Sequence, residues 1–584
     1  MSQRDDDLRV RPGRIGNRGG GKQKTFVHQV LRAAKRAGGK AGGWGRGGRS
    51  DRSGFGRGRS SFGRSRLLGS QRRVLVKARV VRGRSLGARR APLAAHLSYL
   101  KRDGVTRDGT SGQMFDAARN QADDTAFAER CRNDRHHFRF IVSPEDAGEM
   151  TDLRAFTRDL IAQMEIDLGT QLDWLGVDHW NTDNPHVHLL VRGVAEDGSD
   201  LVIARDYISR GLRSRAEDLV SLELGPKPEH EIRSALEREV ESDRWTRLDG
   251  EIRRSADETG FVDLRPQQTG ADDPHIRRLM IGRLQHLERS GLASPAGPAQ
   301  WTLRPDAEPV LRDLGMRGDI IKTMHQALAG RGWERPLGDY VIETGRADSS
   351  IVGRLIDRGL HDELSGETYA VIDGVDGRVH HVRFRGIEAL EFASPLGGIV
   401  EVRRFGVPGD ASPTLMLVAR SDIDVARQIN APGATWLDHR LAAKDDASFA
   451  LGGFGAEARA AVTARVERLI EQGLARRQGQ RVLLARNLLD TLRRRELDAV
   501  GARLAADRGL PHRHVVAGEQ VDGTFRQRFS LSSGRFAMID DGLGFSLVPW
   551  SLSLEKQLGR HVTGVARSDG GIDWSFGRRR ELGL

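Results

Sequence analysis

Cysteine and tyrosine are scarce in this chain of 584 residues, which has one Cys, at position 131, and four Tyr. A single cysteine excludes a disulfide framework and a thiolate zinc cluster, and it fits a reducing, cytoplasmic location. The sequence has neither an apolar run of 18 residues nor a secretory signal, so we expect no membrane insertion. It also lacks a Gly-x-x-x-x-Gly-Lys-Ser/Thr loop, which excludes a fused P-loop motor.

The formal net charge of +13 is distributed unevenly along the chain. Residues 1–73 contain 20 Lys and Arg against 4 Asp, a net charge of +16, so residues 74–584 carry about −3. Residues 1–73 are rich in Gly, Arg and Ser, which predicts a disordered basic tail. Arginine with a few aromatic residues is typical of sequence-tolerant contact with single-stranded DNA or RNA, although a solvated linker or an export-related tail has a similar composition.

Three imidazoles occur within the ten residues from His179 to His188, between two apolar runs. Residues 172–177 and 186–191 have the composition of strands, and residues 181–185 have that of a turn. We therefore expect a β-hairpin with the histidines near its loop.

The register of this hairpin decides whether the three imidazoles converge. His186 and His188 are two residues apart and must point to the same face of a strand. His179 joins them if Trp180 pairs with Pro185 across a four-residue loop, and a slip of one residue would send it to the other face. Three neutral imidazoles on one sheet face favour a divalent metal site of the catalytic kind.

The sequence also offers a tyrosine that is not required in a core. Residues 91–102 have helical spacing, and Tyr99 lies roughly 110° from the centre of the apolar stripe on a wheel of 3.6 residues per turn. Its phenol is therefore a candidate nucleophile, although an amphipathic helix can also carry a half-buried tyrosine of structural value only. Tyr207, after a predicted strand at residues 201–204, is the alternative nucleophile.

The segment from His179 to His188 resembles the histidine-hydrophobe-histidine (HUH) motif of endonucleases that nick single-stranded DNA through a tyrosine. It is most similar to conjugative relaxases of the P mobilisation type, whose third motif runs His-x-Asp and then Pro-His-x-His. Asn181 stands where many relatives have Asp. The stretch at residues 96–104, with Tyr99, resembles the first relaxase motif, and Ser143 resembles the serine of the second. The resemblance covers about residues 74–235.

The resemblance implies a metal-assisted transesterification. The ion would be Mg or Mn, the substrate single-stranded DNA at a transfer origin, and the product a 5′-phosphotyrosyl adduct that starts and ends conjugative transfer. Relaxosome accessory proteins and a type IV secretion coupling protein are the implied partners. The resemblance assigns metal binding to His179, His186 and His188, the nucleophile to Tyr99, and DNA contact to Ser143, Lys101 and Arg102. Asp183 and His96 are both candidates for the base that deprotonates the tyrosine. Asp183 or Asn181 could hold a ring nitrogen of a metal ligand.

Two other functions fit the same motifs. A rolling-circle replication initiator or a transposase would use the same chemistry, and a non-catalytic DNA-binding scaffold would retain the motifs without using them. One tyrosine helix ahead of the histidine motif favours a relaxase over initiators that pair tyrosines on one helix. A metal-dependent covalent adduct would exclude the scaffold.

The second half contains an internal echo. Residues 283–293 followed by 301–305 resemble residues 465–475 followed by 481–485. Each set predicts a helix that ends at Gly-Leu-Ala, a short strand and another helix, which is the order of a winged helix, although two generic helix ends would look similar. Segments at 539–545 and 573–577 resemble the poorly characterised C-terminal region found behind relaxases of this kind.

The predicted fold class is α+β. We expect a disordered basic tail at 1–73, an antiparallel-sheet HUH endonuclease domain at 74–235, a helical linker and winged-helix-like module at 236–320, a β-rich module at 321–450, a second winged-helix-like module at 451–515 and a C-terminal β module at 516–584.

Overall fold

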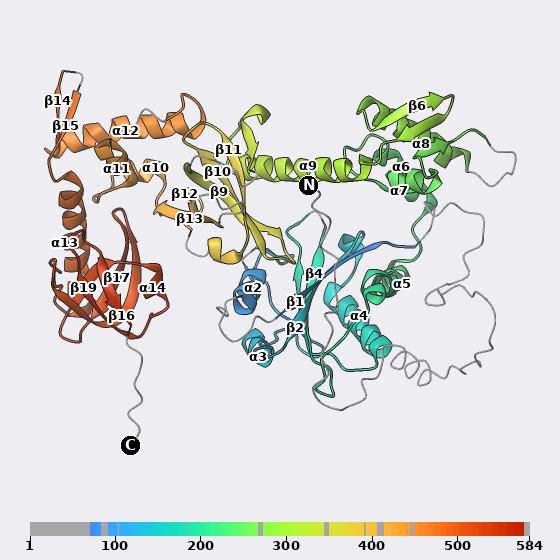
Figure 1. Ribbon diagram of the computed structural model, residues 1–584. Helices are drawn as coiled ribbons and strands as arrows, with labels where there is room; N and C mark the ends of the chain where they lie inside the picture. The colour runs from blue at the N-terminus through green and yellow to red at the C-terminus, as the bar shows by residue number, and fades with distance from the viewer. Residues whose placement is uncertain are drawn as a thin grey trace. The chain divides into compact units, whose positions relative to one another are not determined.

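The computed structural model describes residues 71–82, 92–102, 104–182, 184–266, 273–343, 350–390, 393–405, 414–443, 449–479 and 481–576 (Figure 1). The predicted basic tail lies almost wholly outside the described residues, and Asp183 lies outside them as well. The chain divides into two compact units, Met1–Gly318 and Asp319–Leu584. It is a mixed α+β protein whose sheets are mainly antiparallel, as predicted. Among the described helices, none combines the length and the apolar character that crossing a membrane requires.

The first unit begins with a four-stranded antiparallel sheet in the order β1-β2-β4-β3. Its inner strands are rich in Phe, Val, Leu and Ile and are buried on both faces, as expected of a sheet covered by helices. The strands are β1 (Val74–Arg82), β2 (His136–Pro144), β3 (Trp174–His179) and β4 (His186–Arg192).

Helices cover both faces of this sheet. Because side chains alternate along a strand, one face of the β3-β4 hairpin carries Trp174 and Leu189, and the other carries Leu175 and Leu190. The first face packs on α4 (Leu153–Leu168) and α5 (Leu212–Leu224). The second packs on α2 (Pro92–Leu100) and α3 (Asp124–Arg130). The predicted tyrosine helix therefore covers a defined face of the sheet.

The outer edge of β3 is paired with a single residue from a loop. The Phe115 N–H donates to the Gly176 carbonyl at 2.9 Å, and the Gly176 N–H donates to the Phe115 carbonyl at 2.8 Å. A Cβ at position 176 would lie 2.6 Å from the Phe115 ring, so a glycine is needed where the ring crosses the strand.

The rest of the first unit forms what we call the first helix–hairpin module, residues 229–303. A three-stranded sheet in the order β5-β7-β6 packs with three helices around one core. Its elements are α6 (Glu229–Glu239), α7 (Arg247–Ser255), β5 (Phe261–Asp263), α8 (Pro274–Arg289), β6 (Ala293–Gly297) and β7 (Gln300–Leu303). The helix that follows, α9 (Ala307–Ala329), contains the boundary between the two units.

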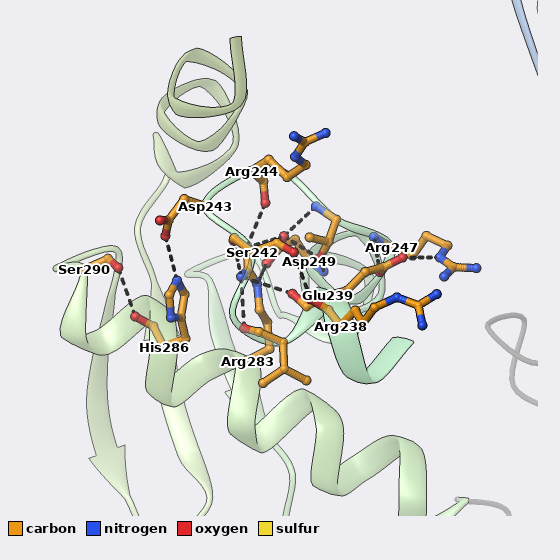
Figure 2. A network of polar contacts seen from close by, with 12 residues as sticks. Arg238, Glu239, Ser242, Asp243, Arg244, Arg247, Asp249, Arg283, His286 and Ser290 are labelled. Atoms are coloured by element: carbon orange, nitrogen blue, oxygen red, sulfur yellow. Dashed lines mark hydrogen bonds and ion pairs between the residues drawn. The ribbon is translucent and has the colours of Figure 1, made fainter. Parts of the chain in front are cut away.

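A fully buried arginine organises this module (Figure 2). Arg283 on α8 makes a bidentate ion pair with Asp249 on α7, at 2.8 and 2.9 Å. Its remaining N–H groups donate to backbone carbonyls of residues 240, 242 and 244. Asp249 also closes a capping box with Thr246 at the start of α7, so the carboxylate joins the two helices.

The second unit repeats this arrangement in what we call the second helix–hairpin module, residues 425–484. Arg465, also fully buried, donates from Nε and Nη2 to the two Asp438 oxygens, each at 2.9 Å. It also donates to the carbonyls of residues 429, 431 and 433. Thr435 donates its backbone N–H and its hydroxyl to Asp438, as Thr246 does to Asp249. The elements are α10 (Val425–Ile429), α11 (Trp436–Ala443), α12 (Gly453–Glu471), β14 (Ala475–Gln478) and β15 (Arg481–Leu484), and α13 (Leu488–Arg508) follows.

The predicted echo therefore corresponds to two modules with one internal design. The second module starts at α10, before the predicted boundary at 451, because α10 and α11 supply the partners of Arg465. The identity of both modules as winged helices stays a prediction.

Two further sheets complete the second unit. The first has six strands in the order β13-β12-β9-β10-β11-β8, with one parallel pair, β11 and β8. The second has five antiparallel strands in the order β18-β17-β16-β19-β20. The strands are β8 (Tyr340–Ile342), β9 (Ile351–Asp362), β10 (Glu367–Gly374), β11 (Val379–Phe384), β12 (Ile399–Phe405), β13 (Thr414–Ser421), β16 (Gln520–Leu531), β17 (Gly534–Asp540), β18 (Phe545–Pro549), β19 (His561–Ala566) and β20 (Ile572–Ser575), with a short α14 (Leu552–Glu555) after β18.

Candidate metal centre

The hairpin of β3 and β4 has the register that brings three histidines to one face. His179 lies opposite His186, and Val177 lies opposite His188. The predicted register is therefore confirmed. The strand pairing ends at His179 and His186, one pair earlier than predicted, and Trp180 and Pro185 belong to a longer loop.

The three imidazoles form a compact cluster. The ring centroids of His179 and His186 are 5.5 Å apart, those of His179 and His188 are 4.4 Å apart, and those of His186 and His188 are 4.9 Å apart. Their ligand nitrogens lie within 4.8 Å of one another. All three side chains are buried.

Backbone carbonyls orient two of the rings. The Nδ1 of His186 lies 2.9 Å from the Asn184 carbonyl, and the Nε2 of His179 lies 2.9 Å from the Leu100 carbonyl. A carbonyl oxygen can only accept, so each of these ring nitrogens carries the proton. The opposite nitrogens, His186 Nε2 and His179 Nδ1, are then left with lone pairs, which is how a protein sets the tautomer of a histidine that binds metal.

The remaining distances suit one small ion. His186 Nε2 and His188 Nε2 are 3.1 Å apart. Two nitrogens that each ligate the same ion at about 2.0–2.1 Å stand at about this separation when they are neighbours in its coordination sphere. Three imidazoles leave further positions of a divalent ion open for substrate oxygens.

The end of β3 is anchored to the helix on the opposite face. Asp178 accepts a hydrogen bond from Arg154 of α4 at 2.8 Å and another from the Trp180 indole at 2.8 Å. The adjacent His179 is therefore held on a rigid strand end rather than on a loop, which favours a pre-organised site. Asp178 was not predicted from the sequence, because its side chain lies on the face of β3 opposite to the histidines.

Tyr99 lies on the helix that touches the histidine cluster. It is the residue before Leu100, whose carbonyl faces His179 at 2.9 Å. The Tyr99 side chain is half-buried, and the Arg102 guanidinium lies 4.8 Å from its ring centroid. Lys101, by contrast, makes an ion pair with Asp124 of α3 at 2.7 Å. Of the two basic residues predicted to contact DNA, Arg102 is beside the tyrosine and Lys101 links α2 to α3.

Ser143 lies at the end of β2, where β2 adjoins the histidine strand. Its hydroxyl donates to the Pro185 carbonyl at 3.3 Å, and its side chain is buried. Pro185 is the residue before His186, so Ser143 positions the strand that carries two of the histidines. Direct contact with DNA through this hydroxyl would require the bond to break.

Tyr207 lies on the other side of the sheet. It begins a π-helical turn (Tyr207–Gly211) and packs against the core of α4 and α5. Its hydroxyl donates to Asp167 at 3.0 Å, and burial together with the Asp167 charge raises the pKa of the phenol. The predicted strand at residues 201–204 is not formed. The structure therefore places the helix that carries Tyr99 on the histidine face, and it places Tyr207 on the opposite face.

A row of basic side chains shares the histidine face and was not identified from sequence. Ile141 pairs with His188 and Lys77 pairs with Ile141, so alternate residues of β2 and β1, including Arg139, Lys77 and Arg79, have the same orientation. Burial, and the charge of Arg79, lower the pKa of Arg139 to about 10, which still leaves it cationic at neutral pH. The alternation of Arg139 with phenylalanines in residues 138–142 was the available signal.

The fold and the site define a mixed α+β protein with a three-imidazole cluster on one sheet face. Comparison with protein families matches residues 280–409 and 410–583 to the family described as "Protein of unknown function (DUF3363)". The match covers a little more than half of the chain, which therefore belongs to this family. The matched residues begin after the sheet that carries the histidines. Neither a curated protein nor a solved structure matches the chain.

Proposed function

We propose that this protein is a relaxase that nicks one DNA strand at a transfer origin through Tyr99. The observation that carries the proposal is the contact between the tyrosine helix and the metal-binding face, in which the Leu100 carbonyl orients the His179 ring at 2.9 Å. The helix of the proposed nucleophile and the proposed metal ligands lie on the same side of one sheet. The resemblance of the same residues to relaxase motifs supports the proposal.

The reaction exchanges one phosphodiester for another. The Tyr99 oxygen attacks phosphorus, the bond from phosphorus to the 3′ oxygen breaks, and that oxygen leaves as a 3′-hydroxyl with the proton that the phenol releases. Tyr99 then holds the 5′ phosphate. Attack by a 3′-hydroxyl reverses the reaction and rejoins the strand without a nucleotide cofactor, because the bond energy is kept in the phosphotyrosine.

The chain's own groups have separate tasks in this reaction. The three histidines would hold a divalent ion, Mg or Mn, which neutralises charge on the scissile phosphate. Arg102, whose guanidinium lies 4.8 Å from the Tyr99 ring centroid, supplies a positive charge beside the proposed nucleophile. Lys77 and Arg79, exposed on the same sheet face, attract the DNA backbone.

Covalent trapping tests the nucleophile. The protein is incubated with Mn²⁺ and single-stranded oligonucleotides tiled across the DNA on both sides of its gene, and a denaturing gel reports the adduct. Tyr99→Phe should abolish the adduct and leave DNA affinity nearly unchanged, because only the attacking oxygen is lost. Tyr207→Phe is the matched control and should retain the adduct. An adduct that persists in Tyr99→Phe and disappears in Tyr207→Phe would overturn the assignment.

Calorimetry with Mn²⁺ tests the metal centre independently of DNA. The double variant His186→Ala, His188→Ala should lose divalent-ion binding, because two of three ligands are removed. His230→Ala changes an exposed histidine of α6 and should bind the ion as the unmodified protein does. Equal ion affinity in the double variant and the control would exclude a metal at this cluster.

A further inference from the structure

The two helix–hairpin modules have different surface charges around the same interior. Residues 283–313, from the buried arginine of the first module into the next helix, contain four Arg and four Asp or Glu. The equivalent residues 465–495 of the second module contain nine Arg and three Asp or Glu. At equivalent structural positions, the first module therefore has a net charge of zero and the second a net charge of +6.

The additional arginines lie on the hairpin and on the helix that follows it. Arg476 of β14 and Arg481 of β15 are exposed, and so are Arg486, Arg494 and Arg495 near the start of α13. In the first module the corresponding residues of β6 are Ser294, Pro295 and Ala296, which are exposed and uncharged. Exposed arginines of one sign on neighbouring elements produce a strong local positive potential.

A surface pocket continues this basic region at α13. It has a volume of about 270 Å³, and its lining includes Arg493 of α13, Arg535 of β17, and Arg567, Asp569, Gly570 and Gly571, which follow β19. Arg535 is paired with Asp422 and Arg567 with Asp569, whereas the carboxylate nearest Arg493 among the described ion pairs, Asp490, is 4.0 Å away. The Gly570 and Gly571 N–H groups already donate to Arg567 and Asp569, so Arg493 is the group of this pocket that is best suited to a phosphate oxygen.

The composition of this region favours a duplex over a single strand. Binding of single strands depends on aromatic side chains that stack on bases, and residues 465–495 contain no Phe, Trp, Tyr or His. A helix followed by a β-hairpin can instead contact the groove and the adjacent backbone of a double helix, with arginines on phosphates.

We infer that the second helix–hairpin module, together with the start of α13, is a binding site for the phosphate backbone of double-stranded DNA, and that the first module is not. This site is distinct from the histidine face, and its test does not depend on nicking.

A fluorescent label on the hairpin locates the bound DNA in the full chain. Gln478→Cys and Ala296→Cys place one exposed thiol on the second and first hairpin, respectively. Cys131 is buried, and burial raises the pKa of its thiol to about 12, so it does not compete for the label. A blunt 30-base-pair duplex of arbitrary sequence should change the emission at position 478 and leave that at position 296 unchanged. Equal responses at both positions, or none at 478 under saturating duplex, would refute the site.

Charge reversal measures the contribution of the hairpin to affinity. Arg476→Glu with Arg481→Glu should weaken duplex binding at least tenfold. It should also flatten the slope of log affinity against log salt by about 1.8, since each phosphate contact on B-DNA contributes about 0.9. The matched control, Ser294→Glu with Ala296→Glu, adds the same two acidic groups to the first hairpin and should change neither quantity by more than a few tens of per cent. Identical slopes for the two double variants would overturn the inference.

Discussion

Arg283 in the first module and Arg465 in the second are equivalent in their surroundings, down to the alternate carbonyls that each guanidinium binds. The hairpins beside them are not equivalent, because one is neutral and the other is basic. The comparison separates two requirements on the same fold. Every N–H of a buried guanidinium must be satisfied, so the interior admits little change. The exposed hairpin has no such requirement, so its charge can differ between the two modules without a cost to the interior.

Removal of either buried carboxylate should have the largest effect. Asp249→Ala and Asp438→Ala each leave a guanidinium without its counter-charge, at a cost of about 3–5 kcal/mol. Native-state hydrogen exchange should show the loss in α8 for the first variant and in α12 for the second. Asp306→Ala, which removes an exposed partner of Arg304, should leave hydrogen exchange in both modules nearly unchanged, because exposed ion pairs contribute little to stability. A large loss in only one module would show that the two interiors are not equivalent.

Loss of the capping threonines should have an intermediate effect. Thr246→Ala removes the hydroxyl that donates to Asp249, and Thr435→Ala removes the one that donates to Asp438. We expect each variant to lose about 1 kcal/mol of stability in its own module, measured by hydrogen exchange. Thr→Ser at either position retains the hydroxyl and should restore most of the stability. If the alanine variants lost as much as the aspartate variants, the threonine rather than the ion pair would be the main support of the buried arginine.

Transfer of charge to the neutral hairpin should have the smallest effect on the folded state. Ser294→Arg with Ala296→Arg makes the first hairpin resemble the second, and hydrogen exchange in α8 should be unchanged because both positions are exposed. The salt slope for duplex binding should steepen by up to about 1.8. No change in the slope would indicate that the arginines near the start of α13, rather than the hairpin, provide the binding.

Local pattern was sufficient to predict the histidine hairpin. Alternation and turn composition defined the register of His179 and His186, because a slip of one residue would invert every side chain. The contact between the His179 ring and the Leu100 carbonyl was not predicted, since it joins residues 79 positions apart and depends on how α2 packs. The end of the ladder was placed one pair too late for a related reason, because the Trp180 backbone N–H donates to the Val105 carbonyl at 2.7 Å instead of pairing with Pro185.

The buried arginines show the same limit. The echo around Gly-Leu-Ala was visible in the sequence, and Thr246 with Asp249 has the spacing of a capping box. The partnership of that box with Arg283 was not visible, because an arginine in a helix is ordinarily exposed and its partner here is 34 residues away. Burial is decided by tertiary packing, and periodicity alone does not report it.

The two edge strands of the four-stranded sheet, β1 and β3, affect how copies of this protein associate at high concentration. Phe115 pairs with Gly176 at the edge of β3, and the edge strand β1 carries Lys77 and Arg79. A strand from a second copy that extended the sheet would meet the Phe115 bridge at Gly176 on one side and a row of cations on the other. Both features disfavour edge-to-edge aggregation, and the cations on β1 also favour colloidal stability.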